Sequence, residues 1–339
     1  MIVSVTPNTA IDYCLRVPEF ILGRTIRSLE SAWGMGGKAA DAAWILGHWG
    51  VTNLAMGFAA GPNGQRMEAM LRERGCQTDF VWVDGETRLN TVICSAGRHS
   101  TFTSSTLEVT SEHVAAFFSK YRLALEQATC VIVGGTLPYG TPSTFFADVI
   151  RLARQKDVPV IFDSSGPNLR AGLDAHPTVI KPNMTELADL TGEGFTYTVS
   201  SQSMADRIQA IYSQAQRVQA QFDVSVVVTL GSDGALGLFG STHYLIPSLN
   251  VEVVSAAGAG DAVLAGLSVA YSQHLPIEDG LRLGFALATA VLLTLATADY
   301  RFEDARGFLP LIELQPLPSK LFATLTSVAS HLSEIERGI

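Results

Sequence analysis

Paired cysteines, basic residues and long apolar runs are all scarce in this sequence of 339 residues. The four cysteines are scattered with no C-x-x-C pair, which argues against a zinc knuckle or a disulfide framework and favours a reduced, cytoplasmic compartment. Lysine and arginine number 23 against 32 acidic residues, for a formal net charge of -9. Nucleic acids and anionic membranes both require a cationic face, so neither is expected as a partner.

No stretch of the sequence is typical of a membrane span or a signal peptide. The uncharged stretch at residues 283–298 is too short to cross a bilayer and is rich in alanine and threonine, so we expect a buried helix there. The first residues lack a basic region and a long apolar region and reach Asp12 early, which predicts a strand. A hydrophobic content of 47% can form a sizeable core and excludes a disordered chain.

Apolar runs and helical patterns alternate along the chain. Runs rich in valine and isoleucine, typical of strands buried on both faces, occupy residues 2–5, 130–135, 158–163, 178–183 and 224–231. Helical patterns lie at residues 112–125, 143–155, 204–219, 262–271 and 281–295. This alternation predicts a three-layer α/β/α domain with a mainly parallel sheet covered on both faces.

Two segments, residues 12–33 and about 80–103, have alternating patterns with no helix between neighbours. They predict antiparallel strands in a small separate sheet that serves as a lid. The sequence has no internal repeat and no Pro/Ser-rich linker. We therefore expect one domain, residues 1–339, into which the β lid is inserted.

The strongest local motif is SAAGAGDAVLAGL, residues 255–267. It predicts a turn at Gly258 and Gly260 and a helix that begins at about Ala259, with backbone N–H groups and the helix N-terminus forming an anion cradle. Asp261 then lies in the first helical turn, where it is a poor phosphate ligand but a good proton acceptor for a hydroxyl that attacks a phosphoryl group. The alternative is a plain glycine-containing loop in which the acid complements the helix dipole.

Two other nucleotide-binding motifs fail on spacing. A dinucleotide fingerprint requires glycine at position 263, where Val263 stands, and the segment is far from a first βαβ unit. A Walker P-loop at Gly37 and Lys38 lacks the leading glycine, replaced by Ala32, and the following serine or threonine, replaced by Ala39.

The segment IKPNMTEL, residues 180–187, leaves two interpretations open. Asn183 and Glu186 are three residues apart after Pro182, the pattern of a helix capping box. The same two side chains could also hold the water ligands of a magnesium ion near nucleotide phosphates.

Three further groups are candidates for ligand binding. In the segment 33–50, Gly36 and Gly37 permit close approach of a ligand, and Lys38 and Asp41 project near a helix start, where they could meet a phosphate and sugar hydroxyls or only solvent. Arginines suit bidentate phosphate contacts, and the candidates are Arg24, Arg27 and Arg88. Residues 226–240 predict a strand, a Ser-Asp-Gly turn and a second strand.

Together these pieces resemble the ribokinase/PfkB carbohydrate kinases, in particular the 1-phosphofructokinase and tagatose-6-phosphate kinase branch. The resemblance spans nearly the whole chain and rests on TPNTAID at 6–12, GGK at 36–38, ETRLN at 86–90, GGTLPYG at 134–140, DSSGPNL at 163–169, KPNMTEL at 181–187, VVTLGSDGALG at 227–237 and GAGD at 258–261.

The resemblance implies ATP-dependent, magnesium-assisted phosphorylation of a hexose phosphate such as fructose 1-phosphate, fructose 6-phosphate or tagatose 6-phosphate, and a homodimer formed through the lid. It makes Asp261 the catalytic base in an anion hole of Gly258, Ala259 and Gly260. It places on the sugar side Asp12, Gly37, Lys38, Asp41 and Arg88, and near the sugar's own phosphate Arg24, Arg27, Arg88 and Thr136. It places on the nucleotide side Lys181, Asn183, Thr229, Gly231 and Gly234, with Asn183 and Glu186 holding magnesium through water.

Several positions depart from the family pattern. Asp41 stands where the family usually has asparagine and Ala39 where it has glycine, residues 255–257 are Ser-Ala-Ala, and residues 295–303 lack the usual asparagine and Gly-Thr. An added carboxylate beside the sugar would repel a nearby phosphate. Two alternatives therefore stay open: a kinase of an unphosphorylated sugar or nucleoside, and a non-catalytic sugar-phosphate sensor.

Overall fold

A computed structural model of the protein describes residues 1–193 and 204–317. The chain divides into two compact units. The first comprises Met1–Thr178 and Leu249–Ile312, and the second comprises Val179–Ser248 and the chain from Glu313 onward. The first unit contains the expected catalytic motif and the expected lid.

The first unit is built on a parallel sheet with the strand order β10-β9-β1-β4-β5. Its strands are β1 (Ile2–Asn8), β4 (Asn53–Ala59), β5 (Gln77–Thr78), β9 (Cys130–Gly134) and β10 (Val160–Asp163), and the short β6 (Val81–Trp82) also pairs with β4. Every residue of β1, β4, β9 and β10 is buried. The apolar runs at residues 2–5, 130–135 and 158–163 therefore form strands covered on both faces, as predicted, whereas β4 was not predicted.

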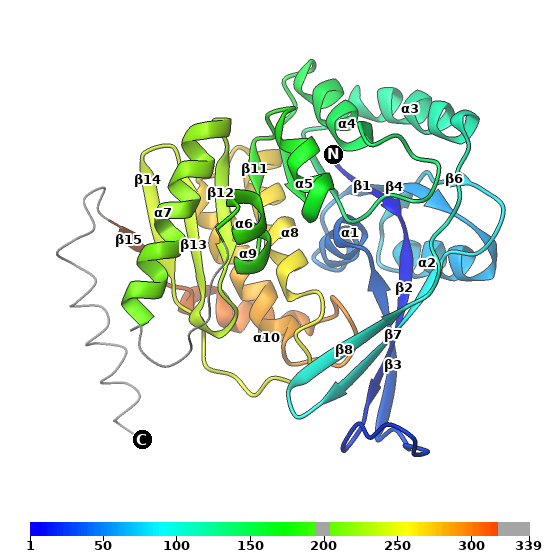
Figure 1. The fold of residues 1–339 in the computed structure, drawn as a ribbon, viewed down its shortest axis with the longest axis horizontal. Helices are drawn as coiled ribbons and strands as arrows, with labels where there is room; N and C mark the ends of the chain where they lie inside the picture. Colours follow the sequence, from blue (N-terminus) through cyan, green and yellow to red (C-terminus); the bar gives the residue numbers. More distant parts are fainter. Residues whose placement is uncertain (194–203, 318–339) are drawn as a thin grey trace. The chain divides into compact units, whose positions relative to one another are not determined.

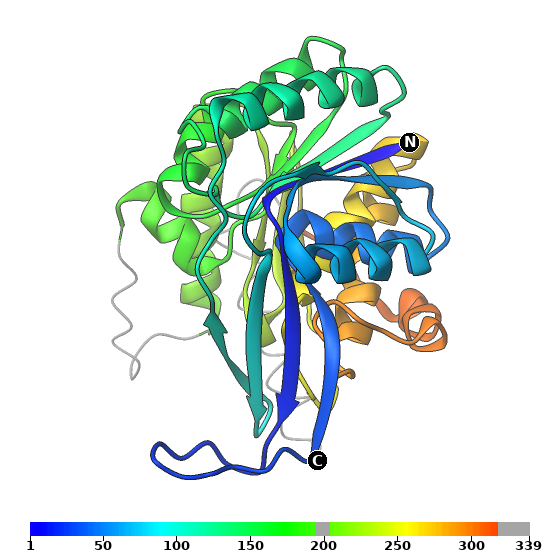
Figure 2. The ribbon, with the colours of Figure 1, turned by 90° about the vertical axis from the view of Figure 1, so that its right-hand side faces the viewer.

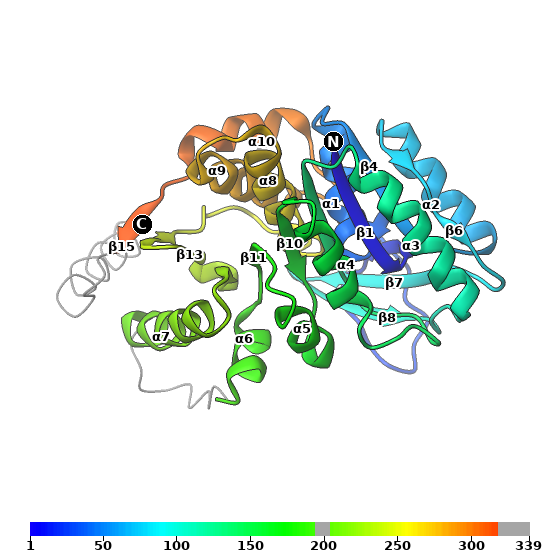
Figure 3. The ribbon, with the colours of Figure 1, turned by 90° about the horizontal axis from the view of Figure 1, so that it is seen from above.

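Helices cover both faces of this sheet. One layer contains α1 (Lys38–His48), α2 (Gly61–Glu73), α8 (Ala259–Gln273), α9 (Ile277–Val291) and α10 (Phe302–Phe308), and the other contains α3 (Ser111–Leu125), α4 (Phe145–Arg154) and α5 (Gly166–Leu173) (Figure 3). A 3-10 turn, Leu309–Leu311, follows α10. The helix predicted at residues 281–295 begins four residues earlier, directly after Pro276, because a proline is well placed just before the first turn of a helix.

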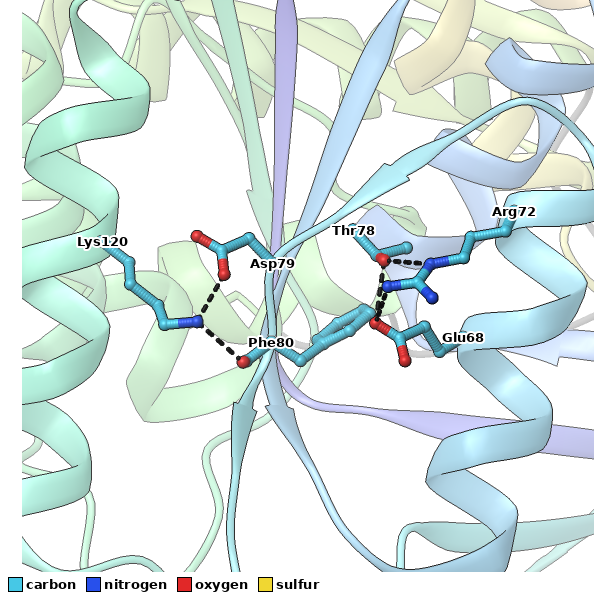
Figure 4. A network of polar contacts seen from close by, with 6 residues as sticks. All are labelled: Glu68, Arg72, Thr78, Asp79, Phe80 and Lys120. Atoms are coloured by element: carbon cyan, nitrogen blue, oxygen red, sulfur yellow. Dashed lines mark hydrogen bonds and ion pairs between the residues drawn. The ribbon is translucent and has the colours of Figure 1, made fainter.

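The edge of the sheet at β5 and β6 is fixed by a polar network between α2 and α3 (Figure 4). Arg72 of α2 donates through Nε to the Thr78 hydroxyl at 2.9 Å, and that hydroxyl donates to Glu68 at 2.8 Å. On the other side, Lys120 of α3 binds Asp79 and donates to the Phe80 carbonyl at 3.1 Å. These contacts hold the segment that leads into the small sheet.

The small sheet has the strand order β3-β2-β7-β8 and extends away from the parallel sheet (Figure 2). Its strands are β2 (Ala10–Arg16), β3 (Glu30–Gly36), β7 (Arg88–Ser95) and β8 (Arg98–Thr103). The prediction of a purely antiparallel sheet is wrong at its centre, because β2 and β7 pair in parallel. β2 continues directly from β1, and β7 follows β6, which is parallel to β4, so both strands leave the parallel sheet in the same direction.

The second unit is a mixed sheet with the strand order β15-β14-β13-β12-β11. Its strands are β11 (Val179–Ile180), β12 (Ser225–Thr229), β13 (Ala235–Phe239), β14 (Thr242–Ile246) and β15 (Gln315–Leu317), and α6 (Met184–Thr191) and α7 (Met204–Phe222) pack on β12 (Figure 1). β12 and β13 pair antiparallel around the 3-10 turn Gly231–Asp233, which confirms the predicted hairpin.

The cysteines and the apolar helices can be compared with what the composition predicts. All four cysteines are buried and unpaired in disulfides. Within residues 1–193 and 204–317, no helix is both long enough and apolar enough to cross a membrane.

Candidate active site

The turn that begins α8 has the conformation that the sequence predicts. Gly258 is the N-cap residue, in the left-handed region with φ of 82°, and the helix begins at Ala259. A Cβ atom on Gly258 would lie 2.4 Å from the backbone nitrogen of Ala298, so only glycine fits there without a shift of the backbone. No side chain caps this helix. The Ala259 N–H donates to the Ala256 carbonyl over a long 3.4 Å, a weak bond that a bound anion could replace.

Asp261 lies in the first turn of α8, at the boundary between accessible and buried residues. Residues 258–261 are partly exposed, whereas the nine residues from Ala262 to Ala270 are buried. The Asp261 backbone N–H donates to the Gly258 carbonyl at 3.0 Å. The helix that follows Asp261 is buried, whereas Asp261 itself stays partly accessible. A proton acceptor for a bound hydroxyl requires such access.

Asp12, on β2, is a buried carboxylate whose two oxygens both accept hydrogen bonds. Asn90 of β7 donates to Oδ1 at 2.8 Å, and the Thr297 hydroxyl donates to Oδ2 at 2.7 Å. Burial raises the pKa of Asp12, and these two hydrogen bonds and the charge of Arg88 oppose the rise. A Cβ on Gly36 would lie 2.5 Å from Asp12 Oδ1, so the glycine leaves space for the carboxylate.

Asp41, in the first turn of α1, is 4% exposed. Its carboxyl lies within hydrogen-bonding reach of the Asp261 side chain. Burial raises the pKa of Asp41 well above its usual value, and the charges of Asp261 and Asp12 raise it further. The structure therefore brings three acids, from β2, α1 and α8, to one place in the first unit.

Arg88, the first residue of β7, is half-buried beside Asp12. Burial lowers the pKa of its guanidinium, and the Asp12 charge opposes that effect. Its Nη2 donates to the Asn8 carbonyl at 3.2 Å, and the Asn8 side chain donates to the Thr136 hydroxyl at 3.0 Å. Asn8 thus joins two residues, Arg88 and Thr136, that the sequence analysis expects near one phosphate.

Lys38 begins α1, directly after Gly37, which has φ of 100°. Its ammonium group forms an ion pair of 2.5 Å with Asp163, whose side chain is 1% exposed, at the end of β10. The lysine side chain is 28% exposed, so Lys38 pairs with a buried carboxylate but remains partly accessible.

Arg24 and Arg27 lie away from this group. Both are exposed on the loop 17–29 that connects β2 to β3 at the far end of the small sheet (Figure 2). The structure brings Arg88 to Asp12 but leaves these two arginines outside the cluster of acids.

The candidate nucleotide residues lie in the second unit, close to the ends of β11 and β12. Asn183 and Thr229 form an isolated β-bridge, and the Thr229 N–H donates to the Pro182 carbonyl at 3.1 Å. Lys181 is buried. Gly231 has φ of 65° and Gly234 has φ of 94°, so both ends of the turn between β12 and β13 are left-handed.

Asn183 and Glu186 form the capping box of α6. The Asn183 side chain accepts from the Glu186 N–H at 2.9 Å, and the Glu186 side chain accepts from the Asn183 N–H at 2.8 Å. Of the two interpretations left open by the sequence, the capping one is confirmed. Across residues 1–193 and 204–317, no three His, Cys, Asp or Glu side chains gather in a geometry that would hold a metal ion.

Four residues of the site were missed by the sequence analysis: Asn8, Asn90, Asp163 and Thr297. Asn8, Asn90 and Asp163 lie inside the motifs TPNTAID, ETRLN and DSSGPNL, which carry the family resemblance, so a signal was present for them. Thr297 lies in a stretch that departs from the family pattern, and its bond to Asp12 links residues 285 positions apart. Only the folded chain reveals that contact.

The first unit has a parallel sheet between two helical layers, a small separate sheet, and an acid that follows an uncapped glycine turn. These features define a ribokinase-like kinase fold. The chain belongs to the pfkB family of carbohydrate kinases, whose model matches residues 5–301. It is therefore a sugar kinase by family, as the sequence motifs predict.

Relatives and solved structures agree with this assignment. The chain is 33% identical over 305 residues to a 1-phosphofructokinase of Haloferax volcanii, covering 90% of this chain and 95% of that protein. It is 28% identical over 290 residues to the 1-phosphofructokinase of Bacillus subtilis, covering 86% and 92%. Phosphofructokinase-2 from Escherichia coli shares the fold, with a TM-score of 0.78 at 21% identity over 91% of this chain and 98% of that one.

Proposed function

We propose that this protein transfers the γ-phosphoryl group of ATP to a hydroxyl group of a hexose phosphate, such as fructose 1-phosphate, fructose 6-phosphate or tagatose 6-phosphate. The observation that carries the proposal is the position of Asp261, partly exposed at the N-terminus of α8 behind an uncapped left-handed turn. The names of the relatives, 1-phosphofructokinases of 28% and 33% identity, support a hexose phosphate as the acceptor.

In the proposed reaction, the sugar hydroxyl oxygen attacks the γ-phosphorus while its proton passes to the Asp261 carboxylate. The new O–P bond forms as the bond between the γ-phosphorus and the ADP oxygen breaks, which yields a sugar bisphosphate and ADP. The backbone N–H groups of Gly258, Ala259 and Gly260, with the N-terminus of α8, stabilise the negative charge on the transferred group.

The acceptor is held, in this proposal, by residues of the first unit. Asp12 and Lys38 bind its hydroxyl groups, and the guanidinium of Arg88 binds its existing phosphate together with Thr136. Because Arg88 lies beside Asp12, it is assigned the main phosphate contact, with Arg24 and Arg27 contributing from the exposed loop.

The nucleotide is assigned to the second unit, to Lys181, Asn183, Thr229, Gly231 and Gly234. Asn183 is exposed and Glu186 partly exposed, and their oxygens already accept backbone hydrogen bonds. Such oxygens fit the water shell of Mg²⁺, which keeps several waters and takes few protein ligands. When bound, Mg²⁺ would neutralise phosphate charge during transfer.

A panel assay tests the proposed function. ATP consumption is measured with the three hexose phosphates, with free fructose and tagatose, and with nucleosides, and products are identified by ³¹P NMR. We expect turnover with at least one hexose phosphate and its loss in Asp261→Asn. Turnover with only unphosphorylated acceptors would favour the sugar or nucleoside kinase, and none at all would favour the sensor.

We also propose that the small sheet forms a homodimer. Leu22 is 85% exposed and Leu29 62% exposed on the loop 17–29, and Phe20 packs against the exposed Phe102 of β8. Exposed apolar side chains gathered in this way are typical of an interaction surface. Sedimentation should give a dimer for the wild type and a monomer for Leu22→Asp, and a wild type that stays monomeric would contradict the proposal.

A further inference from the structure

The two buried acids beside Asp261 differ in how their oxygens are satisfied. Asp12 accepts hydrogen bonds at both oxygens, from Asn90 and Thr297, and has a guanidinium beside it. Asp41 is equally buried, at 4% exposed against 5% for Asp12. Its Oδ1 atom is buried and has no hydrogen-bond partner among residues 1–193 and 204–317. An ionised carboxylate in such surroundings is strongly disfavoured, because no donor replaces the water lost at Oδ1.

The titratable groups that act on Asp41 add to this penalty. Asp261 faces it from α8, and Asp12 and the thiol of Cys14 face it from β2. On its own helix, the nearest cation in sequence is Lys38, which forms an ion pair with Asp163. Two negative charges repel each other strongly when one of them is buried, which favours a proton held by this pair of acids.

The contact between the two carboxyl groups leads to the same conclusion by a separate route. Asp41 and Asp261 lie within hydrogen-bonding reach of each other. Ionised carboxylates only accept hydrogen bonds, so two of them bond to each other only if one carries a proton. A shared proton therefore satisfies both the contact and the burial.

We propose that Asp41 is a positioning residue that works as a neutral carboxylic acid, sharing its proton with the Asp261 carboxylate and so fixing the orientation of the catalytic base. The neutral form donates to one Asp261 oxygen and leaves the other for the sugar hydroxyl. It also avoids a second negative charge where the phosphoryl oxygens pass. The effect of Asp41 on catalysis rests on the proposed function, whereas the shared proton does not.

Loss of the shared proton predicts how kcat/KM changes with pH. As pH rises through the titration of the pair, Asp41 becomes ionised beside Asp261, and the added charge repels the phosphoryl group. The wild-type kcat/KM therefore falls on the alkaline side. In Asp41→Asn, a neutral amide of the same shape donates to Asp261 at every pH, and this fall disappears. In Asp41→Leu, which has no donor, kcat drops at least ~tenfold, the equivalent of one lost hydrogen bond to a charged group.

A stability measurement tests the shared proton without any substrate. The folded protein keeps the Asp41 proton to a higher pH than the unfolded chain, so the wild type loses stability as pH rises above the ordinary aspartate pKa. Asp41→Asn has no such proton to lose. We therefore expect the melting temperature of Asp41→Asn to gain on that of the wild type as pH rises from about 4 to 9, and the gain to shrink in the Asp261→Asn background.

The outcomes separate this proposal from the proposed function. A melting-temperature difference that stays constant with pH, or wild-type and Asp41→Asn rate profiles of the same shape, would overturn the shared proton. If the panel assay finds no phosphorylated product but the melting-temperature difference grows with pH, the proposed function fails and the acid pair stands. If Asp41→Leu does not fold, the comparison of wild type with Asp41→Asn decides alone.

Discussion

The helices α8 and α6 each begin after a turn with candidate ligand residues, yet their N-termini are built in opposite ways. At α6, Asn183 and Glu186 accept each other's backbone N–H groups, so the helix satisfies its own donors. At α8, Gly258 supplies the turn and no side chain caps the helix. A helix that lacks a cap of its own leaves its donors and its dipole for an external anion.

The two helices show two different roles for an acid in the first turn. Glu186 is accounted for by the capping box. Asp261 stands behind an uncapped turn and beside two buried acids from other elements, Asp12 and Asp41, so its position is not explained by the helix alone. We therefore expect substitutions at α8 to change catalysis and substitutions at α6 to change mainly local stability.

The largest effect is expected at the acid of α8. Asp261→Asn removes the proton acceptor but preserves size and hydrogen bonding, so kcat should fall by about 10²–10⁴-fold. Calorimetric affinity for the sugar phosphate should change little, because the acceptor is held mainly by other residues. Substantial turnover in this variant would reject Asp261 as the base.

The next largest effect is expected at the turn itself. In Gly258→Ala, the new Cβ would meet Ala298 at 2.4 Å and the residue would keep a left-handed conformation, so chemical denaturation should show a loss of at least about 2 kcal/mol. Gly231→Ala in the second unit is the matched control, since a Cβ there meets nothing within 4 Å. Only its left-handed backbone costs free energy, about 1–2 kcal/mol. Equal losses would contradict the packing argument.

A smaller effect, on substrate binding, is expected at Arg88. Arg88→Ala removes a charged donor beside Asp12, so KM for the hexose phosphate should rise by about 10–100-fold with less change in kcat. Arg24→Ala and Arg27→Ala change exposed residues of the loop 17–29 and should raise KM less. If all three variants leave KM unchanged, the enzyme holds no acceptor phosphate with these arginines.

The smallest effects are expected at the capping box of α6. Asn183→Ala should lower stability by about 0.5–2 kcal/mol, because it exposes an unpaired N–H at the start of the helix. Glu186→Gln keeps a side-chain acceptor at the same position and should cost at most a few tenths of a kcal/mol. A large rise in the magnesium concentration needed by Glu186→Gln would show that the carboxylate also serves the metal.

Local structure was predictable where short-range physics decides it. The Gly-Ala-Gly turn and the start of α8 at Ala259 follow from one motif, and the hairpin of β12 and β13 follows from another. The capping box also follows from residue types three positions apart. These features depend on backbone conformations and hydrogen bonds between near neighbours, which the sequence order itself brings together.

The pairing of distant segments was predicted less well. The parallel pair β2 and β7 differs from the expected antiparallel sheet, because its direction depends on how both strands leave the parallel sheet. The ion pair of Lys38 with Asp163 joins positions 125 residues apart. A sequence contains no local signal for such a partner, since the choice depends on which elements pack side by side.

Periodicity, glycine positions and capping residues act over a few neighbours, so the sequence predicted many of the strands, helices and turns and the membership of a kinase family, but not β4 or α2. Tertiary structure alone decided that Asp12, Asp41 and Asp261 meet in one buried place and that one of them has an oxygen with no donor. The charge state of a carboxyl group depends on water, donors and other charges around it, and these are set by packing.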